Sequence, residues 1–169
     1  MEQSLVGPPE KIRIPQDEHR FEYVGHLADG RQFMAFVTGA FPDGVKLNWD
    51  TDEWRKVKSW SAVLHLFDAE GNHLSSEARL GGYDVEGRDV AVDKAWSNLE
   101  NMLAQLGPGR RELGEIWVRQ FSATLDGVTH SLLYEAFKGE ENDPVVECVM
   151  LQPRDIMFHP PWDSGEYST

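Results

Sequence analysis

Two tryptophans and three acidic residues lie together in the stretch WDTDEW, residues 49–54. Tryptophan is enriched at the centres of protein interfaces, and carboxylates attract basic partners. The stretch therefore predicts an exposed surface that binds a basic protein; the alternative is that both tryptophans pack onto the sheet. The candidate contacts are Trp49, Asp50, Asp52, Glu53 and Trp54, joined by Asp84 and Glu86 from the loop before a predicted helix.

The histidines and the single cysteine do not form a known metal-binding pattern. No two histidines have the i, i+4 spacing of a helical zinc site, and only Cys148 could assist them. His65 lies between apolar neighbours, which favours a buried neutral imidazole. The alternative function is a small enzyme or ligand-binding protein. It would have a pocket on the open face of the sheet, where His65, His130 or Glu135 meets other polar groups.

Common catalytic and nucleotide-binding motifs are absent from the sequence. It contains no Gly-x-Gly-x-x-Gly, no phosphate-binding Gly-x-x-x-x-Gly-Lys and no Gly-x-Ser-x-Gly motif. These absences count against nucleotide enzymes and common serine hydrolases. We therefore predict no catalytic residue, no metal and no cofactor, and a non-catalytic binding role.

The charge balance is strongly acidic. The chain has 16 lysines and arginines against 29 aspartates and glutamates, a formal net charge of −13. This charge repels nucleic acids and anionic membranes and attracts basic proteins, although it could also serve solubility alone. We expect a basic protein partner, no nucleic acid and no membrane.

The length and the cysteine count indicate the general class of protein. A chain of 169 residues is predicted to form one domain. A single cysteine excludes an internal disulfide and fits a reducing compartment. No signal-peptide pattern is visible, and no apolar run reaches the roughly 18–20 residues that span a bilayer. We expect a cytoplasmic protein, and the sequence leaves its oligomeric state open.

Extended runs joined by turn signals predict three hairpins and one further strand. Asp-Gly pairs at Asp29-Gly30 and Asp126-Gly127 suit the positive φ angles of tight turns. Residues 60–67 are largely apolar on both faces, which predicts a central strand covered on both sides. The hairpins cover 21–41, 60–80 and 114–139, and the further strand covers 145–153.

The clearest predicted element is a helix from Val90 to Leu106. Its apolar positions recur every three or four residues, Asp89 is the predicted N-cap, and Gly107-Pro108-Gly109 ends it. The predicted buried face comprises Val92, Ala95, Trp96, Leu99, Met102, Leu103 and Leu106.

Four strands, one helix and three strands then predict an α+β fold. We expect one antiparallel, twisted sheet of about six to seven strands, with the long helix packed across one face. Residues 1–20 contain three prolines and predict an extended lead-in to a single domain at 21–169.

The C-terminal stretch 157–169 is rich in apolar and aromatic residues, whereas chain ends are usually polar. Pro160 and Pro161 keep its backbone extended. Burial of Phe158 and Trp162 would stabilise docking by about 1.5–3 kcal/mol each. We predict a structural clasp that docks on the domain, with a partner-binding tail as the first alternative and an active-site edge as the second.

Four segments carry a resemblance to a known family. They are HLADG followed by QFMAFVTGAFPDG (26–44), AVLHLFDAEGNH (62–73), LGEIWVRQFSATLDGVTHSLLYE (113–135) and FHPPWDSGEYST (158–169). In this order they resemble a bacterial family of small proteins labelled formate hydrogenlyase regulatory protein, whose small acidic members also resemble immunity proteins. The resemblance implies a regulatory or inhibitory protein that binds another macromolecule, and it implies no catalytic residues.

Overall fold

The computed structural model describes residues 4–106 and 111–169. Within these residues the chain forms two five-stranded antiparallel sheets, a two-stranded ribbon and two α-helices, one of them long. The α+β class and the antiparallel pairing are confirmed, but the prediction of a single sheet of six to seven strands is wrong. Several of the additional strands have only two or three residues, too short to show a period in the sequence.

The first sheet has the strand order β5-β4-β3-β2-β6. It combines two of the predicted hairpins with a short strand from the region after the long helix. Its strands are β2 (Tyr23–Leu27), β3 (Gln32–Ala40), β4 (Ser59–Phe67), β5 (His73–Tyr83) and β6 (Arg111–Leu113).

The second sheet has the order β12-β11-β10-β9-β8 and comes from the C-terminal third of the chain. Its strands are β8 (Phe121–Leu125), β9 (Val128–Phe137), β10 (Val146–Gln152), β11 (Ile156–Phe158) and β12 (Tyr167–Ser168). The ribbon consists of β1 (Ile12–Ile14) and β7 (Ile116–Val118), and the helical elements are α1 (Trp54–Val57), the 3-10 turn η1 (Asp84–Glu86) and α2 (Arg88–Ala104).

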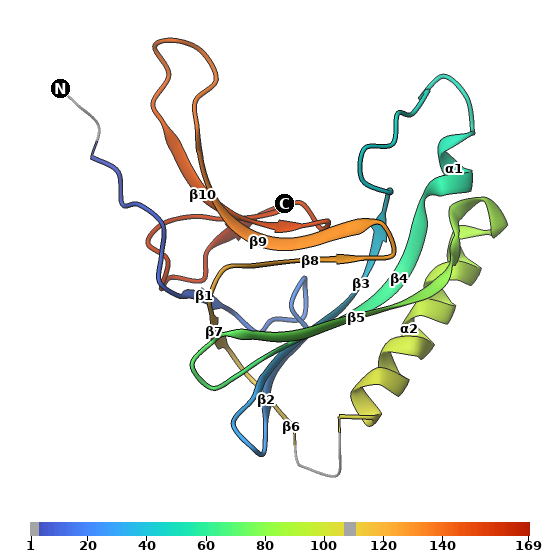
Figure 1. Ribbon diagram of the computed structural model, residues 1–169, viewed down its shortest axis with the longest axis horizontal. Helices are drawn as coiled ribbons and strands as arrows, with labels where there is room; N and C mark the ends of the chain where they lie inside the picture. The colour runs from blue at the N-terminus through green and yellow to red at the C-terminus, as the bar shows by residue number, and fades with distance from the viewer. Residues whose placement is uncertain (1–3, 107–110) are drawn as a thin grey trace.

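The two sheets and α2 form three layers. Figure 1 shows α2 along one face of the first sheet and the β8–β9 hairpin on the other side of β3 and β4. The strand β4 contributes to both interfaces, because Ala62 and Leu64 pack beneath α2 while Val63 and Phe67 join the core between the sheets. Both faces of β4 are therefore covered, as its apolar sequence predicted, and a helix alone could cover only one of them.

The long helix begins at Arg88, two residues before the predicted start. Gly87 precedes it with φ 115°, and Asp89 lies in the first turn instead of at the N-cap. Ala91 joins the buried face, whereas Trp96 is 38% exposed. The predicted stop at residues 107–109 lies outside the described residues.

The helix approaches β5 closely at Gly81. A Cβ atom at this position would lie 2.3 Å from the carbonyl oxygen of Ala91 and 2.7 Å from the amide nitrogen of Ala95. Glycine is required here because the backbone of the helix occupies the space of a side chain.

Both ends of the described chain pack against the second half of the molecule. In the lead-in, β1 pairs with β7 and buries Ile12 and Ile14 completely. At the other end Phe158 is buried, and Trp162 is 9% exposed with its indole Nε1 donating to the carbonyl oxygen of Gly7 at 2.9 Å. No helix within 4–106 and 111–169 is long and apolar enough to cross a membrane.

Candidate functional site

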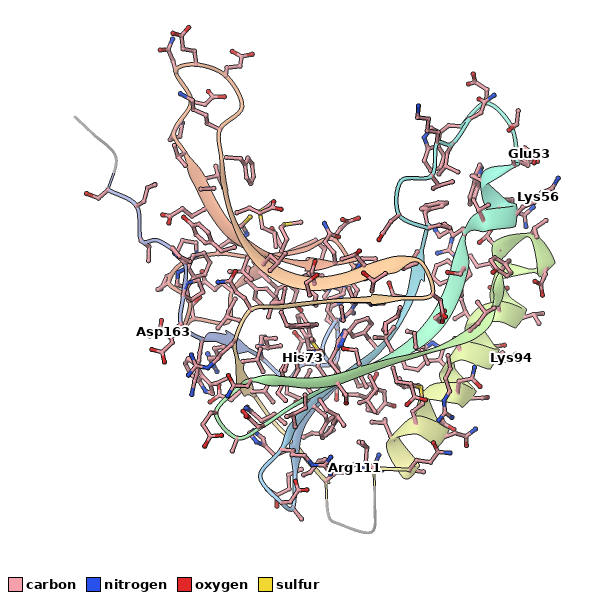
Figure 2. The ribbon with its side chains drawn as sticks, viewed as in Figure 1. Glu53, Lys56, His73, Lys94, Arg111 and Asp163 are labelled. Atoms are coloured by element: carbon pink, nitrogen blue, oxygen red, sulfur yellow. The ribbon has the colours of Figure 1, made fainter. Side chains whose placement is uncertain are left out.

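The predicted binding residues lie mainly in the connection from β3 to β4, which includes α1. In Figure 2, Glu53, directly before α1, and Lys56 of α1 lie at one edge of the molecule, whereas Asp163 of the C-terminal stretch lies at the opposite edge. The clasp is therefore remote from these residues. We call the group Trp49, Asp50, Asp52, Glu53 and Trp54 the Trp49 surface.

Trp49 is the most exposed tryptophan among the described residues, with 65% of its surface accessible. Its ring nevertheless has two aromatic neighbours. Phe41 contacts it edge-to-face at 5.7 Å between ring centroids, and Trp54 lies at 6.2 Å. The indole is held in place without being buried.

A lysine lies against the aromatic side chains beside Trp49. The ammonium nitrogen of Lys58 is 5.9 Å from the ring centroid of Trp54, 5.7 Å from that of Phe41 and 4.8 Å from that of Trp60. Such cation–π contacts each stabilise a site by about 0.5–1 kcal/mol when exposed. They link the connection to the start of β4 and restrict its motion.

The local backbone of this surface is shaped by Asn48. Its side-chain oxygen accepts from the amide of Asp50 at 3.0 Å, and its carbonyl oxygen accepts from the hydroxyl of Thr51 at 3.2 Å. These bonds form a turn directly before α1. The turn presents Trp49 and Asp50 to solvent.

The three carboxylates of the surface are exposed but not equivalent. Glu53 forms an ion pair with Lys56, with 3.1 Å between Oε1 and Nζ. Asp50 and Asp52 have no ion pair with any residue that the structure describes. The two aspartates next to Trp49 are thus available to a basic partner, whereas the charge of Glu53 is partly neutralised.

Asp84 does not belong to the exposed surface that was predicted for it, because only 5% of the residue is exposed. One carboxylate oxygen accepts from Arg55 Nε at 2.9 Å and the other from Trp60 Nε1 at 3.1 Å. Burial alone would raise the pKa of Asp84, but these two hydrogen bonds outweigh it and hold the pKa below its usual value. Asp84 fastens α1 to the sheet, while Glu86 is exposed on η1.

Three residues next to the surface were not among the predicted contacts. Phe41 and Lys58 support Trp49 and Trp54, and Trp60 anchors Asp84. The clustering of four aromatic residues within 41–60 could have pointed to Phe41 and Trp60, and no signal in the sequence pointed to Lys58.

Two of the residues proposed for a pocket also come together, but between the sheets and not on an open sheet face. The rings of His65 and His130 lie 5.8 Å apart between centroids, and His73 lies 6.3 Å from His65. Phe121 stacks on His73 at 4.6 Å, near the middle of the molecule in Figure 2. Glu135 does not join them, because it is exposed further along β9.

A serine links two of these histidines. The hydroxyl oxygen of Ser76 lies 2.6 Å from Nδ1 of His65 and 2.7 Å from Nε2 of His73. A hydroxyl group has one proton, so it donates to one ring and accepts from the other when both rings are neutral. The tautomers of His65 and His73 are therefore coupled.

Burial disfavours the charged form of these imidazoles. Burial first, and then the rings of His130 and His73, lowers the pKa of His65 to about 3. Burial also lowers the pKa of His73 and of His130, in the latter case against the opposing charge of Asp43. Within the described residues no three His, Cys, Asp or Glu side chains are placed to hold one metal ion.

Comparison of the chain with known protein families, with curated proteins and with solved structures finds no match. The resemblance of its segments to the formate hydrogenlyase regulatory family thus stays a prediction.

Proposed function

We propose that this protein is a non-catalytic binding protein and that the Trp49 surface contacts a basic segment of its protein partner. The observation that carries the proposal is the exposed indole of Trp49 held between Phe41 and Trp54. A side chain fixed before binding loses little conformational entropy when a partner covers it. Tryptophan in this state is typical of the residues that contribute most to interface affinity.

Charge supports a basic partner. Asp50 and Asp52 follow Trp49 within three residues of the sequence, and the net charge of −13 favours the approach of cations from a distance. Complementary charge mainly raises the association rate, and salt reduces this effect. A regulatory or inhibitory role would follow if the surface covers a functional site of the partner.

The test uses the whole protein, immobilised as wild type and as matched variants, to capture partners from cell lysate at low and high salt. Trp49→Ala removes the central contact, and Trp96→Ala removes a half-exposed tryptophan from α2 as the control. The captured protein is then purified and its affinity measured for each variant. We expect Trp49→Ala to weaken binding at least tenfold and Trp96→Ala to leave it unchanged.

A second pair of variants tests the charges. Asp50→Asn with Asp52→Asn removes two carboxylates from the surface, and Asp93→Asn with Glu100→Gln removes two exposed carboxylates from α2. Both pairs change the net charge equally, so only the location differs. The first pair should slow association and reduce its salt dependence more than the second. Equal binding by wild type and Trp49→Ala would exclude this surface as the binding site.

A further inference from the structure

A cavity of about 400 Å³ opens between the two sheets, close to the buried histidines. It lies where β3, β4 and β5 meet the turn of the β8–β9 hairpin. Its size falls within the range of small-molecule sites in proteins. The polar groups that line it are Thr38, Ser59, Ser61, Tyr83, Asp126 and His130.

The cavity has a polar lining because the side chains between the sheets change from apolar to polar along the strands. Alternate residues of β4 face the second sheet, and Val63 and His65 are two of them. The same alternation places Ser59 and Ser61 on this face, at the start of the strand. Hydroxyl groups thus replace the aliphatic side chains that fill the rest of this interface.

One lining residue has an unused hydrogen-bonding atom. His130 is 3% exposed, and its Nδ1 atom has no partner among the residues that the structure describes. Buried polar atoms in native proteins are normally paired. His130 also lines the cavity, and no hydrogen bond joins its imidazole to another described residue, so the ring can bond a group that enters the cavity. Nε2 of the neighbouring His65 is likewise buried without a partner within the described chain.

The charge of the lining selects among ligands. Among the residues that the structure describes, no lysine or arginine lines this cavity, and Asp126 is the one carboxylate in its walls. Phosphates and carboxylates would meet no cation there, whereas an ammonium group would meet the carboxylate and several hydroxyl oxygens. The remaining walls include Leu80, Leu125 and Val128, which suit an apolar body.

The hairpin also sets the spacing of the two ends of such a ligand. Asp126 is exposed at the turn, and His130 lies two residues beyond Val128 toward the interior. Two residues of a strand span roughly 7 Å. This span runs from Val128 to His130, and Asp126 lies before Val128 at the turn, so a ligand that reaches both side chains carries its two polar groups at opposite ends of its body.

We propose that this cavity binds a small amine with a hydroxyl group at its far end, with the ammonium at Asp126 and the hydroxyl at His130. The ligand's apolar middle then packs against Leu80 and Leu125. This site is independent of the Trp49 surface, which lies in the connection before β4.

Three probes of similar size test the proposal by titration of the full protein, followed through the ring signals of His130 in NMR spectra. Tyramine has both polar groups, 2-phenylethylamine lacks the hydroxyl, and 3-(4-hydroxyphenyl)propionate replaces the amine by a carboxylate. We expect saturable binding of tyramine, about five-fold weaker binding of 2-phenylethylamine, and no saturable binding of the carboxylate.

Matched variants locate the site. Asp126 has φ 51°, a conformation that asparagine accepts, so Asp126→Asn preserves the turn while it removes the charge. Asp155, with φ 55°, is an exposed aspartate outside this cavity and provides the control Asp155→Asn. Asp126→Asn should weaken tyramine binding about tenfold and Asp155→Asn should not.

Two results would overturn the proposal. One is the absence of saturable tyramine binding to the wild type, and the other is equal affinity for tyramine and for the carboxylate probe. Ala78→Phe, which places an aromatic ring in the cavity, should abolish tyramine binding. If the Ala78→Phe protein does not fold, the tyramine affinity of Asp126→Asn tests the site instead, because Asp126 lies on an exposed turn.

Discussion

The hydroxyl group of Tyr167 donates a hydrogen bond to Oδ2 of Asp17 at 2.6 Å and so joins the two ends of the chain. The other carboxylate oxygen of Asp17 accepts from the backbone amides of His19, Arg20 and Phe21. Burial alone would raise the pKa of Asp17, but the bond from Tyr167 and the three amides outweigh it and lower the pKa to about 2. Burial and the same hydrogen bond raise the pKa of Tyr167 to about 12.

Tyr167→Phe should reduce the free energy of unfolding by about 1.5–3 kcal/mol at neutral pH, because it removes a hydrogen bond to a charged group. The folded state lowers the pKa of Asp17, so the contribution of its carboxylate is present above about pH 4 and is lost as the pH falls through about 2. Urea unfolding at pH 7 and at pH 2 measures this change. Tyr83→Phe removes an exposed hydroxyl as a control, and an equal loss in both variants would contradict the role of Tyr167.

Replacement of Gly81 tests the contact between α2 and β5. Gly81→Ala should lower the free energy of unfolding by about 1–3 kcal/mol, because its methyl group would overlap the backbone of α2 at Ala91. Gly114→Ala is the control, since a Cβ there would have no atom within 4 Å. Denaturant unfolding of both variants gives the comparison, and a Gly81→Ala protein as stable as Gly114→Ala would show that the helix can shift at no cost.

The local turns of this fold could be predicted from the sequence, because their chemistry is local. Asp126 and Gly127 have φ angles of 51° and 78°, as a tight Asp-Gly turn requires. At Asp29-Gly30 only Gly30 has a positive φ, 91°, so the hairpin is present but its turn differs from the predicted one. The division into two sheets and a ribbon could not, since it depends on pairings between distant segments, such as Gly25 with Leu113 in the first sheet and Ile12 with Val118 in the ribbon. Strands of three residues contain no usable period, and their partners lie far away in the sequence.

The candidate site, too, could be predicted from the sequence only in part. The exposure of Trp49 was one of two alternatives, and the sequence alone could not choose between them. Asp84 looked like a further acidic contact, but its burial depends on Arg55 and Trp60, which come from other elements. The pairing of His65 with His130 likewise arises only when β9 packs across β4, although the alternative pocket included both residues.

The buried histidines should make stability depend on pH. The folded state lowers the pKa of His65 from 6.5 to about 3, so between these values the unfolded chain binds a proton that the folded chain excludes. The contribution of His65 is therefore complete above pH 6.5 and decreases as the pH falls. At pH 5 the loss amounts to about 2 kcal/mol.

The difference between variants isolates this effect from the other titrating groups. Urea unfolding of wild type and His65→Leu is compared at pH 7.5 and pH 5, and the wild type should lose about 2 kcal/mol more than the variant. Val63→Ala, at a fully buried position on the same face of β4, should lower stability equally at both pH values. If His65→Leu retains the full pH dependence of the wild type, the buried imidazole is not its source.

The last prediction concerns the C-terminal clasp. Trp162→Ala should lower the free energy of unfolding by about 3–5 kcal/mol, because it leaves a cavity in the core. Trp162→Phe keeps most of the ring but loses the bond from Nε1 to the carbonyl oxygen of Gly7, which should cost about 1 kcal/mol.

Trp49→Ala is the matched control for this pair, since Trp49 is 65% exposed and Trp162 only 9%. Its effect on unfolding should be about 0.5 kcal/mol or less. If Trp162→Ala is much less stable than Trp49→Ala, Trp162 has a structural role, whereas Trp49 is not needed for stability and can serve binding. If Trp162→Ala were as stable as Trp49→Ala, the C-terminal stretch would contribute no stability, and its alternative role as a partner-binding tail would gain support.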